Sequence, residues 1–280
     1  MTQVVAPPVA APTTALVTEA RLSSVFLAAV RSERTKLTTV RSTMWALIIT
    51  VVSTVGFGAL LTAIVVNQWD HRSLAEVTGF DPLLYSFAGL NVAQLCIGVL
   101  GVLVMTSEYA TGMIRLTFGA TPQRRLLLGA KVLTFSVVIA VVSLASCVTV
   151  FFIGQAILAT KQAGVSITDP GVLRAVIGGA VHMVLIGVIA IAVGAIVRHT
   201  AGAVAILFGV LLIIPGLVQL LPQPWNNDVT LYLPSSAGSA MSAVVRFPNL
   251  LSPLGGFLVL TAYAVAMLAV ASIVLVRRDA

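Results

Sequence analysis

Side chains that could perform chemistry are few in this 280-residue chain, which has three histidines and two cysteines. The histidines His71, His182 and His199 are far apart in the sequence. Cys96 and Cys147 lie in apolar runs, so the chain has no CxxC metal spacing and no disulfide framework. The phosphate-binding pattern GxxxxGK[ST] is missing as well, because no Gly-Lys dipeptide occurs. The sequence therefore predicts no metal site, no cofactor and no catalytic residue, and any ATP must be hydrolysed by another polypeptide.

His182 is the one side chain for which an enzymatic role stays open. It is the only ionisable group well inside the apolar stretches described below, and Ser143 or Ser146 is expected at a similar depth. Neither serine stands in the GxSx context of a serine hydrolase. Because a lone histidine in an apolar helix more often hydrogen-bonds to a neighbouring helix, we favour that role and expect no enzyme activity.

Composition and hydropathy place the chain in a membrane. Hydrophobic residues make up 59% and charged residues 9%, whereas a soluble domain carries roughly 25% charged residues. The mean hydropathy of +1.07 excludes a water-soluble globular enzyme. A transmembrane helix needs about 20 mostly apolar residues. Six stretches qualify, which predicts an all-α polytopic membrane protein with six transmembrane helices: Met44–Val66, Leu83–Met105, Val132–Ala159, Leu173–Val197, Ala203–Leu221 and Leu254–Val276.

The few charged residues set the expected orientation. With both termini in the cytoplasm, the inside segments hold 12 Lys and Arg and the outside segments hold 4, as the positive-inside rule requires. The net charge of +7 is thus a topology signal, and no nucleic-acid partner is expected. The predicted spans contain no Asp, Glu or Lys, so they lack the relay groups of ion-coupled transporters.

Prolines mark several expected helix starts. A capping residue followed by Pro satisfies free amides and presets φ for the first turn. Four such pairs precede a span or its lead-in: Asp81-Pro82, Thr121-Pro122, Asp169-Pro170 and Ser252-Pro253. Pro215-Gly216 falls inside the fifth span instead, where it should kink the helix or end it early.

The residues before the first span divide into two parts. Residues 1–21 are rich in Pro, Ala, Thr and Val and are expected to form a flexible tail. Over residues 22–43, apolar residues recur at helical spacing with basic residues on the other face. This pattern predicts an amphipathic helix on the cytoplasmic membrane surface. Glu33 interrupts the apolar stripe; it either pairs locally with Lys36 at i, i+3, which we favour, or contacts a partner domain.

The largest cytoplasmic loop, residues 106–131, joins the second and third spans. It begins with Glu108 at the membrane exit and ends with Arg124, Arg125 and Lys131. A simple connector would be shorter and polar. Apolar residues in this loop need burial against lipid headgroups or another protein, and we favour docking of a soluble partner: Met113, Ile114, Leu116 and Phe118.

A long outer segment, residues 222–253, precedes the last span. A short helix over Ser236–Phe247 is expected at the membrane interface. Trp225 and Tyr232 are typical of the interfacial aromatic belt, and a gate or lid is the second interpretation.

Small and polar residues within the spans predict helix contacts. Asn91 and Gln94 share one helix face at i, i+3, and Gln219 lies near the end of the fifth span. Such amides either hydrogen-bond between helices or line a cavity for an amphipathic cargo. A ridge of small residues on the fourth span predicts close helix packing: Gly187, Ala190 and Gly194.

Four short motifs, in this order on a six-span chain, resemble the membrane subunits of type-2 ABC exporters. They are SERTKLTTVRSTMW (residues 32–45), SEYATGMIR (107–115), TPQRRLLLGAK (121–131) and YLPSSAG (232–238), and the resemblance extends over residues 24–280. It implies a permease in a bacterial plasma membrane that pairs with a second permease, as a homodimer or heterodimer. Two separate ATPase subunits would bind ATP and Mg. The implied cargo is a drug-like, antibiotic or other amphipathic compound, with a lipid, glycolipid or peptide as the alternative.

The resemblance also implies residue roles. A coupling helix from Glu108 to about Phe118 would enter a cleft of the ATPase, and the amphipathic helix would connect membrane and ATPase. The residues implied in this coupling are Glu108, Tyr109, Gly112, Arg115, Arg124, Arg125, Glu33 and Lys36. Cargo would pass along the permease dimer interface, with the pathway residues Asn91, Gln94, Gln219 and His182.

Overall fold

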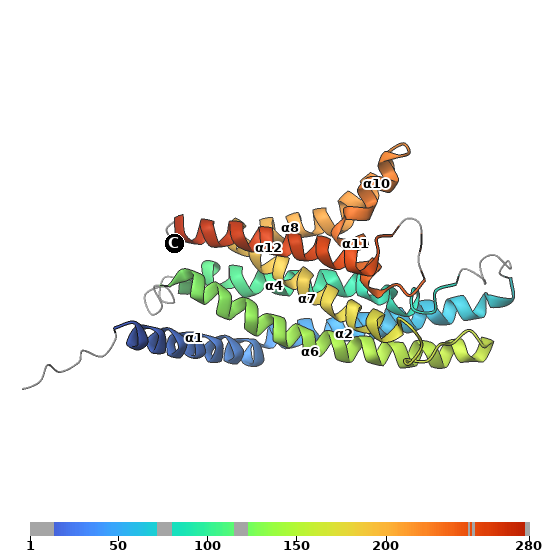
Figure 1. The fold of residues 1–280 in the computed structure, drawn as a ribbon, viewed down its shortest axis with the longest axis horizontal. Coiled ribbons are helices and arrows are strands. Elements are labelled where there is room, and N and C mark those ends of the chain that lie inside the picture. Colours follow the sequence, from blue (N-terminus) through green and yellow to red (C-terminus); the bar gives the residue numbers. More distant parts are fainter. Residues whose placement is uncertain (1–13, 72–79, 115–122, 246, 248–249, 278–280) are drawn as a thin grey trace, which may run out of the picture.

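The computed structural model describes residues 14–71, 80–114, 123–245, 247 and 250–277, with side chains from residue 24 onward. All regular secondary structure in these residues is helical. Figure 1 shows an elongated bundle in which most of the long helices run along one axis. Six helical stretches are long and apolar enough to cross a membrane, each overlapping one predicted span: Arg41–Asn67, Ser86–Ala110, Arg124–Lys161, Val172–Val197, Thr200–Val218 and Pro253–Arg277. The predicted all-α fold of a polytopic membrane protein is therefore confirmed.

Most spans contain one principal helix. The helices of the six spans, in chain order, are α2 (Arg41–Asn67), η2 (Ser86–Gly89) with α4 (Leu90–Ala110), α6 (Arg124–Leu158) with η3 (Ala159–Lys161), α7 (Val172–Val197), α8 (Thr200–Phe208) with η4 (Gly209–Ile213) and α9 (Ile214–Val218), and α12 (Pro253–Arg277). Outside the spans lie α1 (Thr14–Thr39), η1 (Trp69–His71), α10 (Trp225–Tyr232) and α11 (Pro234–Ser242).

The capping pairs predicted from the sequence have different outcomes. Ser252 caps α12, because its Oγ accepts a hydrogen bond from the Gly255 amide at 3.1 Å. Asp169 lies in the turn before α7, where Gly171 with a φ of 86° is the N-cap residue. Asp81 also lies before its helix, and turns and η2 separate it from α4. Thr121-Pro122 lies outside the described residues.

Helix α6 is much longer than a membrane is thick. Its 35 residues correspond to about 52 Å, whereas the hydrocarbon core measures about 30 Å. One end of α6 therefore extends beyond the membrane, and α1 packs against this helix (Figure 1). Helix α1 begins at Thr14, before the predicted boundary at residue 22, and residues 1–13 lie outside the described part of the chain.

The fifth span contains a wide turn just before Pro215. Proline has no N–H, so the regular i to i+4 hydrogen-bond ladder is interrupted there. The segment η4 is π-helical and precedes α9, which contains Pro215 near its start. The helix ends at Val218, before the predicted Leu221, so the sequence located the irregularity correctly.

Helix α7 is at the centre of the bundle. Two thirds of the residues in its 18-residue apolar stretch are buried, a larger share than in the other five spans. Helix α7 packs against α4, α6, α11 and α12. The approach of α4 to α7 depends on small residues. A methyl group added at Gly101 of α4 would lie 2.8 Å from the Gly187 carbonyl oxygen and 2.9 Å from the Ala190 methyl. Close packing along the predicted Gly187, Ala190 and Gly194 ridge is therefore confirmed.

This contact gives a first testable prediction. Replacing Gly101 with alanine should lower the free energy of unfolding by about 1 to 3 kcal/mol, because the added methyl overpacks the contact between α4 and α7. Gly129 of α6 is the matched control, since a methyl there meets no atom within 4 Å, and its replacement by alanine should be neutral or add up to about 1 kcal/mol. Thermal unfolding in detergent compares the two variants. Equal shifts would contradict the packing account.

Candidate functional site

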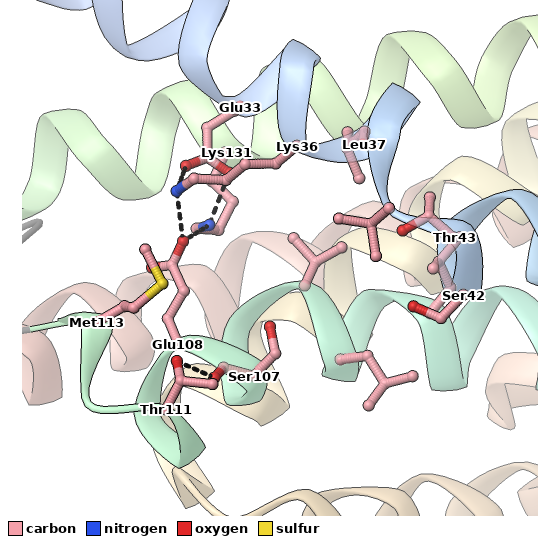
Figure 2. Close-up of a pocket in the computed structure, with 14 residues that line it drawn as sticks. Glu33, Lys36, Leu37, Ser42, Thr43, Ser107, Glu108, Thr111, Met113 and Lys131 are labelled. Atoms are coloured by element: carbon pink, nitrogen blue, oxygen red, sulfur yellow. Dashed lines mark hydrogen bonds and ion pairs between the residues drawn. The ribbon is translucent and has the colours of Figure 1, made fainter.

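Four charged side chains meet at one end of the bundle. The Lys131 ammonium of α6 donates to Glu33 Oε2 at 2.7 Å and to Glu108 Oε1 at 2.9 Å. The Lys36 ammonium of α1 donates to Glu33 Oε1 at 2.8 Å and to the same Glu108 Oε1 at 2.7 Å. Figure 2 shows the two lysines converging on the Glu108 carboxylate. We call Glu33, Lys36, Glu108 and Lys131 the ion cluster; it ties α1, α4 and α6 together.

Helix periodicity places each member of the cluster. On α1, Ala29, Glu33 and Leu37 follow one another at i, i+4 and i+8, and all three are buried. Glu33 therefore occupies a position on the buried stripe, and at this stripe protein rather than lipid covers the helix. Glu108 comes from the last turn of α4, which ends at a turn where Gly112 adopts a φ of 69°.

The cluster is buried and electrically balanced. Glu33 and Lys131 are each 2% exposed and Glu108 is 7% exposed, while the side chain of Lys36 is 37% exposed. Two ammonium groups face two carboxylates, so the group carries no net charge. Partial burial acts to lower the pKa of Lys36, but the hydrogen bonds to Glu108 and Glu33 outweigh it and hold that pKa above its usual range. Lys36 therefore remains charged at neutral pH, and it loses its proton only in strongly alkaline solution.

Sequence reasoning identified part of this arrangement. The local pair of Glu33 with Lys36 is confirmed at 2.8 Å. The contacts of Glu33 with Lys131 and of Glu108 with both lysines were not anticipated. Two features of the sequence could have indicated these contacts: Lys131 stands among apolar residues, and Glu33 interrupts an apolar stripe. Both positions predict buried charges, and buried charges in proteins are paired.

A cavity of about 320 Å³ lies beside the ion cluster (Figure 2). One part of its wall is polar and includes the cluster with Ser42, Ser107 and Thr111. The other part is apolar and is formed by α1, the residue that follows it, and α4: Leu37, Val40, Leu100, Leu103 and Val104. The cavity is thus amphipathic, with its apolar wall toward the membrane-spanning part of α4.

Two arginines, Arg124 of α6 and Arg198 after α7, bind the end of α12 at the same end of the bundle. Arg124 Nη1 donates to the Leu275 carbonyl at 2.8 Å, and Arg198 Nη2 donates to the Val274 carbonyl at 3.3 Å. Both satisfy carbonyl groups near the end of α12, which the helix itself leaves without partners. The Arg198 guanidinium also lies 5.2 Å from the centre of the Tyr109 ring.

The predicted coupling residues thus separate into two groups. Glu33, Glu108, Tyr109 and Arg124 face inward and connect helix ends, with Lys36 half-exposed beside them. Gly112 and Arg125 lie on the surface, together with Met113, whereas Ile114 is buried. Arg115 lies outside the described residues. The exposed residues could therefore contact a partner directly, whereas the inward-facing residues would act through the packing of the helices.

The four predicted pathway residues differ in burial. Asn91 is exposed on α4, whereas Gln94, three residues further on, is 3% exposed and its Nε2 donates to the Asn91 carbonyl at 3.3 Å. Gln219 is exposed at the end of α9. Their shared role in cargo passage stays a prediction.

His182 is 2% exposed and lies in the contact between α7 and α11. A methyl group added at Gly238 would collide with the imidazole ring, so the ring packs directly against the α11 backbone. In the part of the chain that the structure describes, neither imidazole nitrogen has a hydrogen-bond partner. The expected hydrogen bond to a neighbouring helix is therefore not formed, and no Ser-His pair is formed with Ser143 or Ser146 either.

Asp81 and Arg174 bind the backbone of the segment around the end of α11, at the opposite end of the bundle. Asp81 is 1% exposed; its Oδ2 accepts from the Val244 and Val245 amides at 2.9 Å, and its Oδ1 accepts from the Leu83 amide at 2.8 Å. Arg174 of α7 donates to the carbonyls of Met241 and Ala243. The segment after α11 is thus held from two sides.

The short helix predicted over Ser236–Phe247 is displaced. The structure has α11 over Pro234–Ser242, preceded by α10, and the chain is extended at Ala243. There Arg174 binds the Ala243 carbonyl, and Asp81 binds the amides of the two residues that follow.

Comparison of the sequence with models of protein families and with curated proteins finds no match. What the chain does therefore rests on its own residues and geometry, which are those of a polytopic helical membrane protein with a buried ion cluster at one end of its spans.

Proposed function

We propose that this chain is the membrane-spanning permease subunit of an ATP-driven exporter of the type-2 ABC class. It would pair with a second permease and with separate ATPase subunits, and it would move an amphipathic cargo out of the cell across the plasma membrane. The energy would come from the partner, because the chain has neither a P-loop nor acidic relays within its predicted spans.

The ion cluster is the observation that carries this proposal. It joins α1, the end of α4 and the start of α6. These are the segments in which the sequence resemblance places the connecting helix and the two ends of the coupling loop. A displacement of the loop by a partner would be transmitted to α1 and α6 together, because buried ion pairs resist separation.

Two exposed residues from the ends of the loop between α4 and α6 supply a docking face in this proposal. Met113 is 49% exposed although it is apolar, and Arg125 is exposed at the start of α6. An apolar anchor beside a charged rim is typical of protein interfaces. ATP binding would change the position of the docked ATPase and so shift the permease between two conformations of different cavity access.

Charge reversal on this face tests the proposal in cells. Wild-type chain expressed with its partner should lower the accumulation of at least one compound in a panel of fluorescent amphipathic dyes. Arg125→Glu should abolish that effect at an unchanged amount of chain in the membrane. Asp228→Arg is the control, because it reverses the charge of an exposed residue on α10 at the other end of the molecule. This variant should export the dye normally. Normal export by Arg125→Glu would count against docking at this face.

A further inference from the structure

The cavity beside the ion cluster has the polarity profile of a phospholipid. Its apolar wall includes Leu100, Leu103 and Val104, which belong to a membrane-spanning helix. Its polar wall includes Ser107 and Glu108, one to two turns further along the same helix, where that helix ends. A molecule seated there would place an acyl chain at the depth of the hydrocarbon and a headgroup at the membrane surface.

Two groups of the cluster have hydrogen-bonding capacity that the other cluster residues do not use. Glu108 Oε2 is buried and, among the described residues, has no hydrogen-bond partner, although Oε1 accepts from both lysines. A buried carboxylate oxygen without a donor is unfavourable. The Lys36 ammonium has three N–H groups, of which Glu33 and Glu108 use two, and its side chain is partly exposed. Glu108, which lines the cavity, thus has one buried acceptor without a donor, and Lys36, which also lines it, has donor capacity left.

These two groups define the charge of a matching ligand. The four cluster side chains sum to zero, so a purely anionic or purely cationic headgroup would match one group and oppose the other. A zwitterionic headgroup with a phosphate and a primary ammonium satisfies both, because the phosphate accepts from Lys36 and the ammonium donates to Glu108.

We propose that this cavity binds a phosphatidylethanolamine-type lipid from the adjoining membrane leaflet. The lipid ammonium donates to Glu108, the phosphate accepts from Lys36, and the upper part of an acyl chain lies along Leu103 and Val104. The bound lipid fills the space between α1 and α4 beside the ion cluster. This inference does not depend on the exporter proposal, because it concerns only the described cavity.

Lipid binding can be measured on purified, delipidated chain in detergent. Short-chain phosphatidylethanolamine, phosphatidylcholine and phosphatidylglycerol with the same acyl chains are titrated, with thermal unfolding and native mass spectrometry as readouts. Phosphatidylcholine has the same net charge as phosphatidylethanolamine but no N–H donor. We expect phosphatidylethanolamine to bind roughly tenfold more tightly, the effect of one charge-assisted hydrogen bond.

Two variants locate the site. Leu103→Trp fills the apolar part without changing a charge and should remove the preference for phosphatidylethanolamine. Leu133→Trp makes the same substitution at a position on α6 that is 46% exposed and outside the cavity lining, and it should retain the preference. Glu108→Gln keeps only a neutral acceptor at this position and should therefore lose most of the preference for the ethanolamine lipid over the choline lipid. Equal binding of the two lipids by wild-type chain, tighter binding of phosphatidylglycerol, or an unchanged preference in Leu103→Trp would overturn the proposal.

Discussion

Replacing Lys131 with methionine should lower the free energy of unfolding by about 3 to 5 kcal/mol. Lys131 is 2% exposed and is the partner of both Glu33 and Glu108, so its loss leaves two buried carboxylates to share one ammonium. The cost arises from the uncompensated charge more than from the lost contact. Unfolding of the purified chain in detergent, followed by heat or by denaturant, measures it.

A second substitution separates charge from packing. Lys131→Met combined with Glu33→Gln again leaves one ammonium and one carboxylate, those of Lys36 and Glu108, which lie 2.7 Å apart. The double variant should therefore recover at least half of the lost stability. Lys161→Met is the control, because its ion pair with Asp70 is at the surface, where solvent screens it, and its loss should change the stability much less than the loss of Lys131. A double variant less stable than Lys131→Met would contradict the electrostatic explanation.

The second large effect is expected at Asp81. Its carboxylate accepts three backbone hydrogen bonds while 1% exposed, so Asp81→Ala should lower the free energy of unfolding by roughly 2 to 4 kcal/mol. Two of these bonds hold the segment after α11. Hydrogen–deuterium exchange at Val244 and Val245 should therefore become faster in the variant, while exchange in the centre of α7 changes much less.

Asp169 offers a matched control for this prediction. It also precedes a proline ahead of a span, but its Oδ2 accepts a single exposed hydrogen bond, from the Ser166 amide. Asp169→Ala should cost less than about 1 kcal/mol and leave exchange at Val244 unchanged. If both alanine variants had the same small effect, Asp81 would be an ordinary turn residue and the outer segment would be held by other contacts.

The same two aspartates show what the sequence can predict. An Asp-Pro pair before an apolar run predicts a turn leading into a helix, and both positions have one. The local bond from the Leu83 amide to Asp81 belongs to this short-range pattern. The bonds from the Val244 and Val245 amides come from 163 and 164 residues further along the chain, and no local pattern encodes them.

The spans were predictable because hydropathy over about 20 residues is a strong local signal. The ion cluster was only partly predictable for the opposite reason. Glu33 with Lys36 is one helical turn and was foreseen, whereas Lys131 reaches Glu33 across 98 residues and depends on how α1 packs against α6. The burial of Asn91 and Gln94 was not predictable either. Residues three apart lie on roughly the same helix face, but here Asn91 is exposed and Gln94 is buried, because the edge of the helix contact runs between them.

Purification of the tagged, full-length chain from its native cells in mild detergent tests the central claim most directly. The proposed exporter predicts that a soluble subunit with a P-loop co-purifies in a fixed ratio and that the complex hydrolyses ATP. It also predicts that Arg125→Glu loses both the subunit and the activity while remaining folded. The account would be contradicted if the folded wild-type chain carried neither a nucleotide-binding subunit nor ATPase activity in any of the mild detergents tried.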